Sequence, residues 1–376
     1  MLKDGNKGIT LVALVLTIII LLILAGISIS ALTNTGIFEK AEEAKRKTEE
    51  AENEEQKNLE EYEIAFDENT TVKLVNDKMN KVLSTKKNVK IEDEKGNIFI
   101  LPAGFKIVVD DTTDNAKTVD KGIVVEDATV NEDGTKTSTN GSQFVWIPVG
   151  TVTKLDGTKT EINFNRYAFD REGKTKEYSG LYIEEDESNK ESLKEYGNVI
   201  AKDISKFKTS VVKNKGFYIG RYEARRNTNG EITEIGTDNV WNNITQPDAA
   251  NQARDMYDSK YSFTSDLMNS YAWDTSIVFL QNCGDNSKYS QQTSLNIDTL
   301  ATAGTNMQDI KDFQCNIYDM ASNVREWTTE TSSDSSKPCI YRGGGYNNLE
   351  ILTSSRVIYE TSYVGKDIGF RILLYL

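Results

Sequence analysis

Residues 317–327 read IYDMASNVREW, residues 341–346 read YRGGGY and residues 368–371 read IGFR. The glycines at positions 343–345 permit positive φ and a close approach of other backbone. Trp327 and Phe370 are large apolar side chains next to charged residues, which is typical of core positions with polar neighbours. These stretches are therefore predicted to specify the fold of the last part of the chain.

Arg371 lies close to the end of this set, and the sequence offers two carboxylates for it. We expect Arg371 to pair with Glu223 or with Glu326, because a charged side chain in a core needs a partner of opposite charge. The main role predicted for Arg342, Trp327, Phe370 and Arg371 is to hold the fold together.

Two more stretches precede these motifs, FVWIPVG at 144–150 and GFYIGRYE at 216–223. Taken in order, the five stretches resemble the formylglycine-generating enzyme and sulfatase-modifying factor family. The resemblance covers residues 141–376 and implies a mixed α+β domain with a fold of the C-type-lectin kind. Within it, helices are predicted at about residues 248–257 and 265–281.

Catalysis is where this resemblance fails. The oxidases of the family bind copper through two cysteines that follow the RGG motif, and the matching residues here are Asn348 and Thr353. The related iron-dependent enzymes use histidine ligands, and this sequence has no histidine. We therefore expect a non-catalytic member without copper, and a residual enzyme of the family is the less favoured alternative.

The resemblance also implies a calcium site at the NVREW loop. Asn323 and Glu326 match the family motif there, and the backbone carbonyl of Val324 is the third expected ligand. Oxygen ligands of these kinds are the ones that calcium prefers. Arg325 replaces the usual tryptophan of the motif, and its pairing with Glu326 would replace the ion.

The segment between RGG and GFR forms the ligand-binding face in non-catalytic relatives. In this sequence the segment is rich in Tyr, Asn and Ser, which suit binding loops because they combine contact area with adaptable hydrogen bonds. The predicted ligand-binding residues are Tyr346, Asn347, Asn348, Glu350, Tyr359, Glu360 and Tyr363. The segment also resembles the variable region of proteins that are diversified by retroelements.

The N-terminal region has a different character. An uncharged apolar run covers residues 9–32 after a short polar leader, residues 1–8. As a helix, 24 residues would span about 36 Å, which exceeds a bilayer core of about 30 Å. The run therefore predicts a transmembrane helix and a single-pass membrane protein with its C-terminal domain outside the cell. A plain anchor and a cleaved secretory signal are the alternatives to the reading that follows.

The leader and the start of the apolar run, KGITL, resemble a type IV prepilin. The resemblance implies that a prepilin peptidase cuts between Gly8 and Ile9 and that Ile9 is then methylated. Ala13 stands where the family usually has Glu, so a minor pilin or pseudopilin is favoured over a shaft subunit.

Residues 33–68 follow as an acidic segment rich in helix formers, which predicts a helical stalk. Residues 69–140 contain β-branched runs separated by polar turns and are predicted to form a small β-rich spacer.

The net charge of −14 excludes general nucleic-acid binding, which needs a basic surface. One disulfide among Cys283, Cys315 and Cys339, or three buried thiols, would fit the sequence equally well.

Together these features predict a surface adhesin or minor pilin that displays a lectin-fold domain for a glycan or protein ligand. Its further partners would be the membrane, other pilins and the prepilin peptidase. A structural pilus or pseudopilus component without its own ligand is the alternative.

Overall fold

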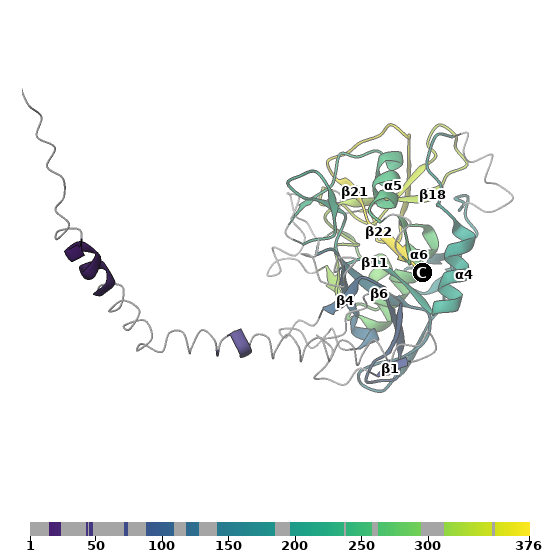
Figure 1. Cartoon of the computed structure of the whole chain (residues 1–376). Helices are drawn as coiled ribbons and strands as arrows, with labels where there is room; N and C mark the ends of the chain where they lie inside the picture. Colours follow the sequence, from purple (N-terminus) through teal and green to yellow (C-terminus); the bar gives the residue numbers. More distant parts are fainter. Residues whose placement is uncertain are drawn as a thin grey trace, which may run out of the picture. The chain divides into compact units, whose positions relative to one another are not determined.

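The structure is a computed structural model of the chain (Figure 1). It describes residues 15–23, 43, 45–47, 71–73, 88–108, 118–127, 141–184, 196–236, 238–257, 262–294, 312–347 and 350–376. The chain divides into two compact units, Met1–Asp67 and Glu68–Leu376. The predicted boundary at residue 140 therefore falls inside the second unit.

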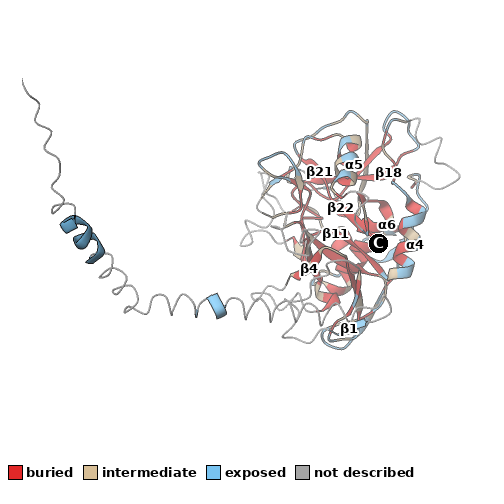
Figure 2. Cartoon of the chain, in the orientation of Figure 1, coloured by how far each residue is buried: buried red, intermediate tan, exposed pale blue. Residues whose placement is uncertain are grey.

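In the first unit, residues 15–23 form a helix whose side chains are exposed (Figure 2). Among the residues that the structure describes, no helix is both long enough and apolar enough to cross a membrane. The predictions of a transmembrane helix over 9–32 and of a single-pass membrane location are therefore wrong. The predicted processing residues Gly8 and Ile9, and most of the predicted stalk, lie outside the described residues.

The second unit is mainly β, so the predicted α+β class with a long N-terminal helix is also wrong. A six-stranded sheet in the order β15-β22-β11-β6-β5-β4 lies at its centre, and every pair in it is antiparallel. Its strands are β4 (Phe105–Val108), β5 (Val124–Asp127), β6 (Gln143–Pro148), β11 (Gly216–Gly220), β15 (Thr264–Leu267) and β22 (Ile372–Tyr375).

Aromatic and β-branched side chains explain why these segments form buried strands. β6 and β11 cover most of the stretches FVWIPVG and GFYIGRYE, and they pair so that Trp146 lies opposite Tyr218. Both rings are fully buried, with centroids 4.9 Å apart. β4 and β5 come from the segment predicted as a spacer, and β5 pairs directly with β6. That segment thus completes the central sheet instead of standing apart from it.

A second sheet has four strands in the order β20-β19-β18-β21. β18 (Arg325–Thr331) pairs with β19 (Cys339–Arg342) in antiparallel fashion and with β21 (Ile368–Phe370) in parallel, and β20 (Arg356–Tyr359) forms one edge. All three motifs quoted from the C-terminal part contribute strands to this sheet or lie beside it. β18, β19 and β21 are buried throughout, as Figure 2 shows for β18 and β21.

Short strands and 3-10 turns complete the unit. They are β1 (Thr71–Lys73), β2 (Val89–Glu92), β3 (Ile98–Leu101), η3 (Val119–Lys121), β7 (Gly150–Thr153), β8 (Lys159–Ile162), β9 (Tyr167–Phe169), β10 (Thr175–Glu177), β12 (Arg225–Arg226), β13 (Ile232–Thr233), β14 (Asn239–Val240), η4 (Tyr289–Gln291), β16 (Phe313–Gln314) and β17 (Ile317–Tyr318).

Three helices are described in this unit: α4 (Ile204–Asn214), α5 (Gln246–Asp255) and α6 (Ser270–Cys283). Each begins after a side chain that caps its free backbone N–H groups, namely Asp203, Thr245 and Asn269. The predicted helix 265–281 overlaps α6 but starts too early. Residues 265–267 lie in β15, and the cap at Asn269 sets the start of the helix.

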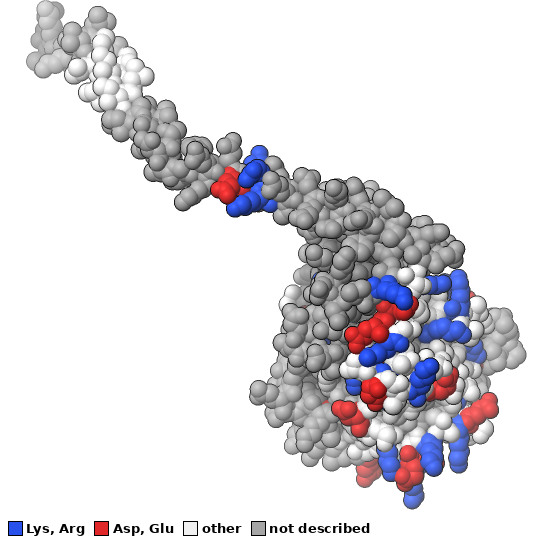
Figure 3. Space-filling model, turned by 90° about the horizontal axis from the view of Figure 1, so that it is seen from below, with Lys and Arg blue, Asp and Glu red and all other residues white. Residues whose placement is uncertain are grey.

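Charged side chains of both signs are interspersed on the face of this unit drawn in Figure 3. Basic and acidic groups alternate there, as is usual for a solvated protein surface.

Candidate functional site

Three of the predicted ligand-binding residues come together beside one edge of the second sheet. Asn347 contacts Arg325 directly, and Tyr359 and Tyr363 adjoin it through Tyr341. Arg325 was not among the predicted ligand-binding residues. The Nη1 group of Arg325 donates to the hydroxyl of Tyr341 at 3.2 Å, and its Nη2 group donates to Oδ1 of Asn347 at 3.2 Å. The guanidinium also forms a 3.0 Å ion pair with Asp367. Both members of this pair are largely buried, so Arg325 is held in one position.

The tyrosine rings form a continuous group, called here the tyrosine cluster: Tyr341, Tyr359 and Tyr363. Tyr341 and Tyr359 are stacked with centroids 5.6 Å apart, and Tyr359 and Tyr363 lie 4.0 Å apart. Tyr341 is buried, whereas the other two are half-buried. The cluster therefore runs from the core to the surface.

Sheet register explains this grouping. Tyr341 lies opposite Val357, and Cys339 lies opposite Tyr359, so the two tyrosines are diagonal neighbours on one face of the β19–β20 pair. Tyr363 returns to them through a turn in which its N–H donates to the carbonyl of Glu360 at 3.2 Å. Trp327 of β18 packs against the cluster. Its ring centroid lies 6.0 Å from that of Tyr341 and 6.5 Å from that of Tyr363.

Two hydroxyls of the cluster, those of Tyr341 and Tyr363, have a raised pKa. Burial raises the pKa of Tyr341 to about 12, although Arg325 acts in the opposite direction. Burial and the neighbouring Tyr359 also raise the pKa of Tyr363. Rings of this kind offer apolar faces together with hydroxyls that donate and accept.

The remaining predicted ligand residues are more scattered. Glu350 and Glu360 are exposed, and Tyr346 is half-buried with its N–H donating to the carbonyl of Asn323 at 2.8 Å. Asn348 lies outside the described residues.

Arg325, Tyr341 and Asp367 are the members of the site that sequence reasoning missed. The substitution of Arg325 for the usual tryptophan was the available signal, but its predicted partner was Glu326. Successive residues of a strand point to opposite faces, and Arg325 accordingly pairs with Asp367, across the parallel β18–β21 contact.

The predicted calcium ligands are engaged with protein groups. Glu223 accepts hydrogen bonds from the backbone N–H of Val324, at 2.8 Å, and from the side-chain amide of Asn323. Glu326 pairs with Arg371 at 2.7 Å. Within the described ranges, no group of three or more Asp, Glu or Cys side chains has a metal-binding arrangement. Calcium stays a prediction.

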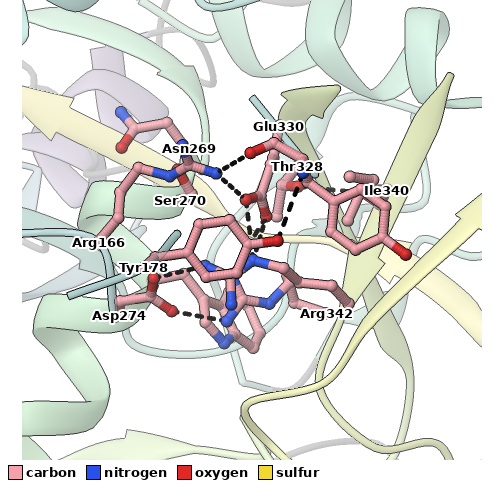
Figure 4. Close-up of polar contacts among 12 residues, drawn as sticks. Arg166, Tyr178, Asn269, Ser270, Asp274, Thr328, Glu330, Ile340 and Arg342 are labelled. Atoms are coloured by element: carbon pink, nitrogen blue, oxygen red, sulfur yellow. Dashed lines mark hydrogen bonds and ion pairs between the residues drawn. The ribbon is translucent and has the colours of Figure 1, made fainter. Parts of the chain in front are cut away.

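On the opposite side of β19 and β20, a buried network joins three arginines to two carboxylates (Figure 4). Asp274 of α6 lies 2.6 Å from both Arg342 and Arg356. Glu330 of β18 pairs with Arg166, Arg342 and Arg356. The network ties α6 and the segment before β9 to the second sheet.

Tyr178 lies between two of these guanidiniums. Its ring centroid is 4.0 Å from Cζ of Arg356 and 4.7 Å from Cζ of Arg166. Such cation–π contacts strengthen when the groups are desolvated. Each charged member of this network forms an ion pair with another member. We therefore interpret the network as a structural one that holds β20 in place through Arg356.

The three cysteines are free thiols, and Cys283 and Cys339 are buried. Burial raises the pKa of each of these two thiols to about 12. The position matched to the second copper cysteine, Thr353, is buried, and its hydroxyl donates to the carbonyl of Gln292 at 3.1 Å.

Comparisons with known proteins leave the family open. No model of a protein family matches the chain, and no curated protein matches it. The solved structure of CarF is 17% identical, covers 36% of this chain and 67% of its own, and superposes with a TM-score of 0.26. PvdO from Pseudomonas aeruginosa is 14% identical, and the match covers 66% of this chain and 98% of PvdO with a TM-score of 0.33. Variable protein 1 of Treponema denticola is 12% identical, and the match covers 72% of this chain and 99% of that protein with a TM-score of 0.21. At these TM-scores the likenesses identify neither fold nor function.

Proposed function

We propose that this protein is a non-catalytic ligand-binding protein and that its ligand contacts Tyr359 and Tyr363. One observation carries the proposal: two half-buried tyrosine rings, 4.0 Å apart and inclined by 31°, continue outward from Tyr341, whose hydroxyl contacts the buried Arg325–Asp367 pair. Fixed aromatic rings provide contact area at a low entropic cost of ordering. The exposed Glu360 and Asn347 lie at the border of this surface and would supply adaptable hydrogen bonds.

Two features of the chain support the non-catalytic part of the proposal. The sequence has no histidine, which is the commonest general base near neutral pH. The raised pKa of Cys283 and Cys339 keeps both thiols protonated, and a protonated thiol is a poor nucleophile.

The test uses the full chain against two probes, an array of defined glycans and a displayed library of random 12-residue peptides. We expect binders in at least one probe set, and we expect Tyr359→Ala with Tyr363→Ala to weaken their binding at least tenfold. Tyr182→Ala is the matched control, because Tyr182 is also half-buried but lies outside the cluster. Binding that survives the double substitution, or no binder in either set, would contradict the proposal.

A further inference from the structure

β20 is an edge strand with a free side. Within the described part of the chain, β19 is the strand paired with β20, and the backbone of residues 356–359 makes no hydrogen bond to any other segment. All four residues of β20 are half-buried, whereas β19 and β21 are buried throughout. The outer N–H and C=O groups of such an edge are a template for another strand.

The composition of β20 is compatible with this pairing. Its sequence is Arg-Val-Ile-Tyr, without the Lys or Pro residues that often protect an edge. Val357 and Ile358 favour the extended conformation. The guanidinium of Arg356 is directed inward, to Asp274 and Glu330 at 2.6 and 2.8 Å, and is neutralised there.

The strand is also fixed at both ends. Arg356 is held by two carboxylates and by the ring of Tyr178, 4.0 Å away. The ring of Tyr359 is stacked on Tyr341 and also packs against the tilted ring of Tyr363, with centroids 5.6 and 4.0 Å away. A strand already ordered in its bound conformation loses little conformational entropy when a partner binds.

We propose that β20 binds an extended peptide segment of a protein partner, which adds to the second sheet as a fifth strand. The inference rests on the proposed function, since Tyr359 belongs both to β20 and to the tyrosine cluster. Hydrogen bonds to the outer edge of residues 356–359 provide affinity. Alternate peptide side chains, which point to one face of the sheet, contact Tyr359 and Tyr363 and provide specificity. An unpaired backbone ladder is complementary to another backbone, which is why a polypeptide is favoured over a glycan.

Backbone methylation of the peptide tests the ladder directly. Peptides selected from the random library would be resynthesised with one N-methyl group at each position in turn and measured against the full chain. Because donors along a strand alternate in direction, methylation at alternate positions should weaken binding at least tenfold, and at the intervening positions less than threefold. Uniform sensitivity, or none, would overturn the proposal.

Variants of the protein provide the matching test. Val357→Pro and Ile358→Pro each remove one backbone N–H, and one of these groups points to β19 while the other points outward. We expect the variant that retains wild-type thermal stability to lose peptide binding at least tenfold. Ile358→Val, which keeps the N–H, should bind within threefold of wild type. Hydrogen exchange of residues 356–359 should slow when a selected peptide binds, and unchanged exchange would contradict strand addition.

The outcomes separate this inference from the proposed function. Glycan binders that depend on Tyr359 and Tyr363, without any peptide binder, would overturn strand addition and leave the proposed function standing. Association of the chain with itself through residues 356–359, seen as concentration-dependent sedimentation that Ile358→Pro or Val357→Pro abolishes, would assign the edge to a second copy and overturn the inference. Peptide binding with period-two sensitivity but independent of Tyr363 would support the ladder and contradict the proposed role of the cluster.

Discussion

Arg371 and Glu326 form a completely buried ion pair in which the guanidinium donates to both carboxylate oxygens, at distances of 2.7 to 3.2 Å. The same guanidinium donates to the carbonyls of Gly220, at 2.9 Å, and Tyr318, at 2.8 Å. One side chain therefore connects β18, the central sheet and β17. The raised pKa of Arg371, for which Glu326 is the main favourable cause, agrees with this position.

Replacement of Arg371 by Met should destabilise the protein by about 3–5 kcal/mol, because Glu326 would be left buried without a counter-charge. Arg371→Lys should recover only part of this loss, since an ammonium cannot reproduce the forked geometry. Urea unfolding would measure both variants, with the exposed Lys213→Met as the control. A loss below 1 kcal/mol for Arg371→Met would show that the pair is not needed for stability.

Gly343 and Gly230 allow a matched test of close packing. Both have positive φ, 78° and 86°, but a Cβ at Gly343 would lie 2.6 Å from the carbonyl oxygen of Met320, whereas a Cβ at Gly230 would meet nothing within 4 Å. Gly230→Ala should cost about 1 kcal/mol, from backbone conformation alone.

Gly343→Ala should cost at least about 1 kcal/mol more than this, because backbone must also shift to relieve the contact. The difference in the free energy of unfolding between the two variants is the measurement. Equal losses would mean that the second sheet adjusts freely around position 343.

The thiols give a third prediction. Because burial raises the pKa of Cys283 and Cys339 to about 12, we expect neither to react with a disulfide reagent at pH 7.5 while the chain is folded. Cys315 is half-buried, so its reaction should be slow. All three cysteines of the sequence should react after unfolding in urea. Fewer than three reactive thiols under non-reducing denaturing conditions would reveal a disulfide instead.

The sequence allowed us to predict elements that depend on short stretches of neighbouring residues. The stretches 144–150 and 216–223, quoted for the family resemblance, contain most of β6 and β11, and Gly343, which was expected to permit positive φ, has it. The sequence offered two carboxylates, Glu223 and Glu326, as partners of Arg371. In the structure Arg371 pairs with Glu326. Glu223 serves instead to bind the backbone at Val324.

Features that depend on which strands meet could not be predicted in this way. The Arg325–Asp367 pair exists because β18 and β21 run side by side in parallel, although their residues are far apart in the chain. Residues 69–140 were predicted to be a separate spacer because nothing local indicates that β5 pairs with β6. The apolar character of residues 9–32 predicted a membrane helix from composition alone, whereas no helix among the described residues is both long and apolar enough to cross a membrane.

Glu184 makes stability depend on pH. It is buried, it accepts a hydrogen bond from the backbone N–H of Ser270 at 2.7 Å, and the hydroxyl of Thr329 lies 3.2 Å from it. Burial is the main cause that raises its pKa from 4.5 to about 7; Glu330 acts in the same direction and Arg166 opposes it. Between these two values the folded state holds a proton that the unfolded state releases. The contribution of Glu184 to stability is therefore complete below about pH 4.5 and is lost as the pH rises through 7.

Glu184→Gln keeps the neutral form at every pH. We expect the free energy of unfolding of wild type, relative to this variant, to fall by up to about 3 kcal/mol between pH 4 and pH 8. The pKa of Asp127 is raised from 3.8 to about 6, so its contribution to stability should also be lost as the pH rises through this range. Asp127→Asn therefore provides an independent comparison. Urea unfolding of the three chains across this range measures the effect. If the difference between wild type and Glu184→Gln is the same at both ends, Glu184 titrates normally in the folded protein, and its burial beside Ser270 and Thr329 does not hold the proton.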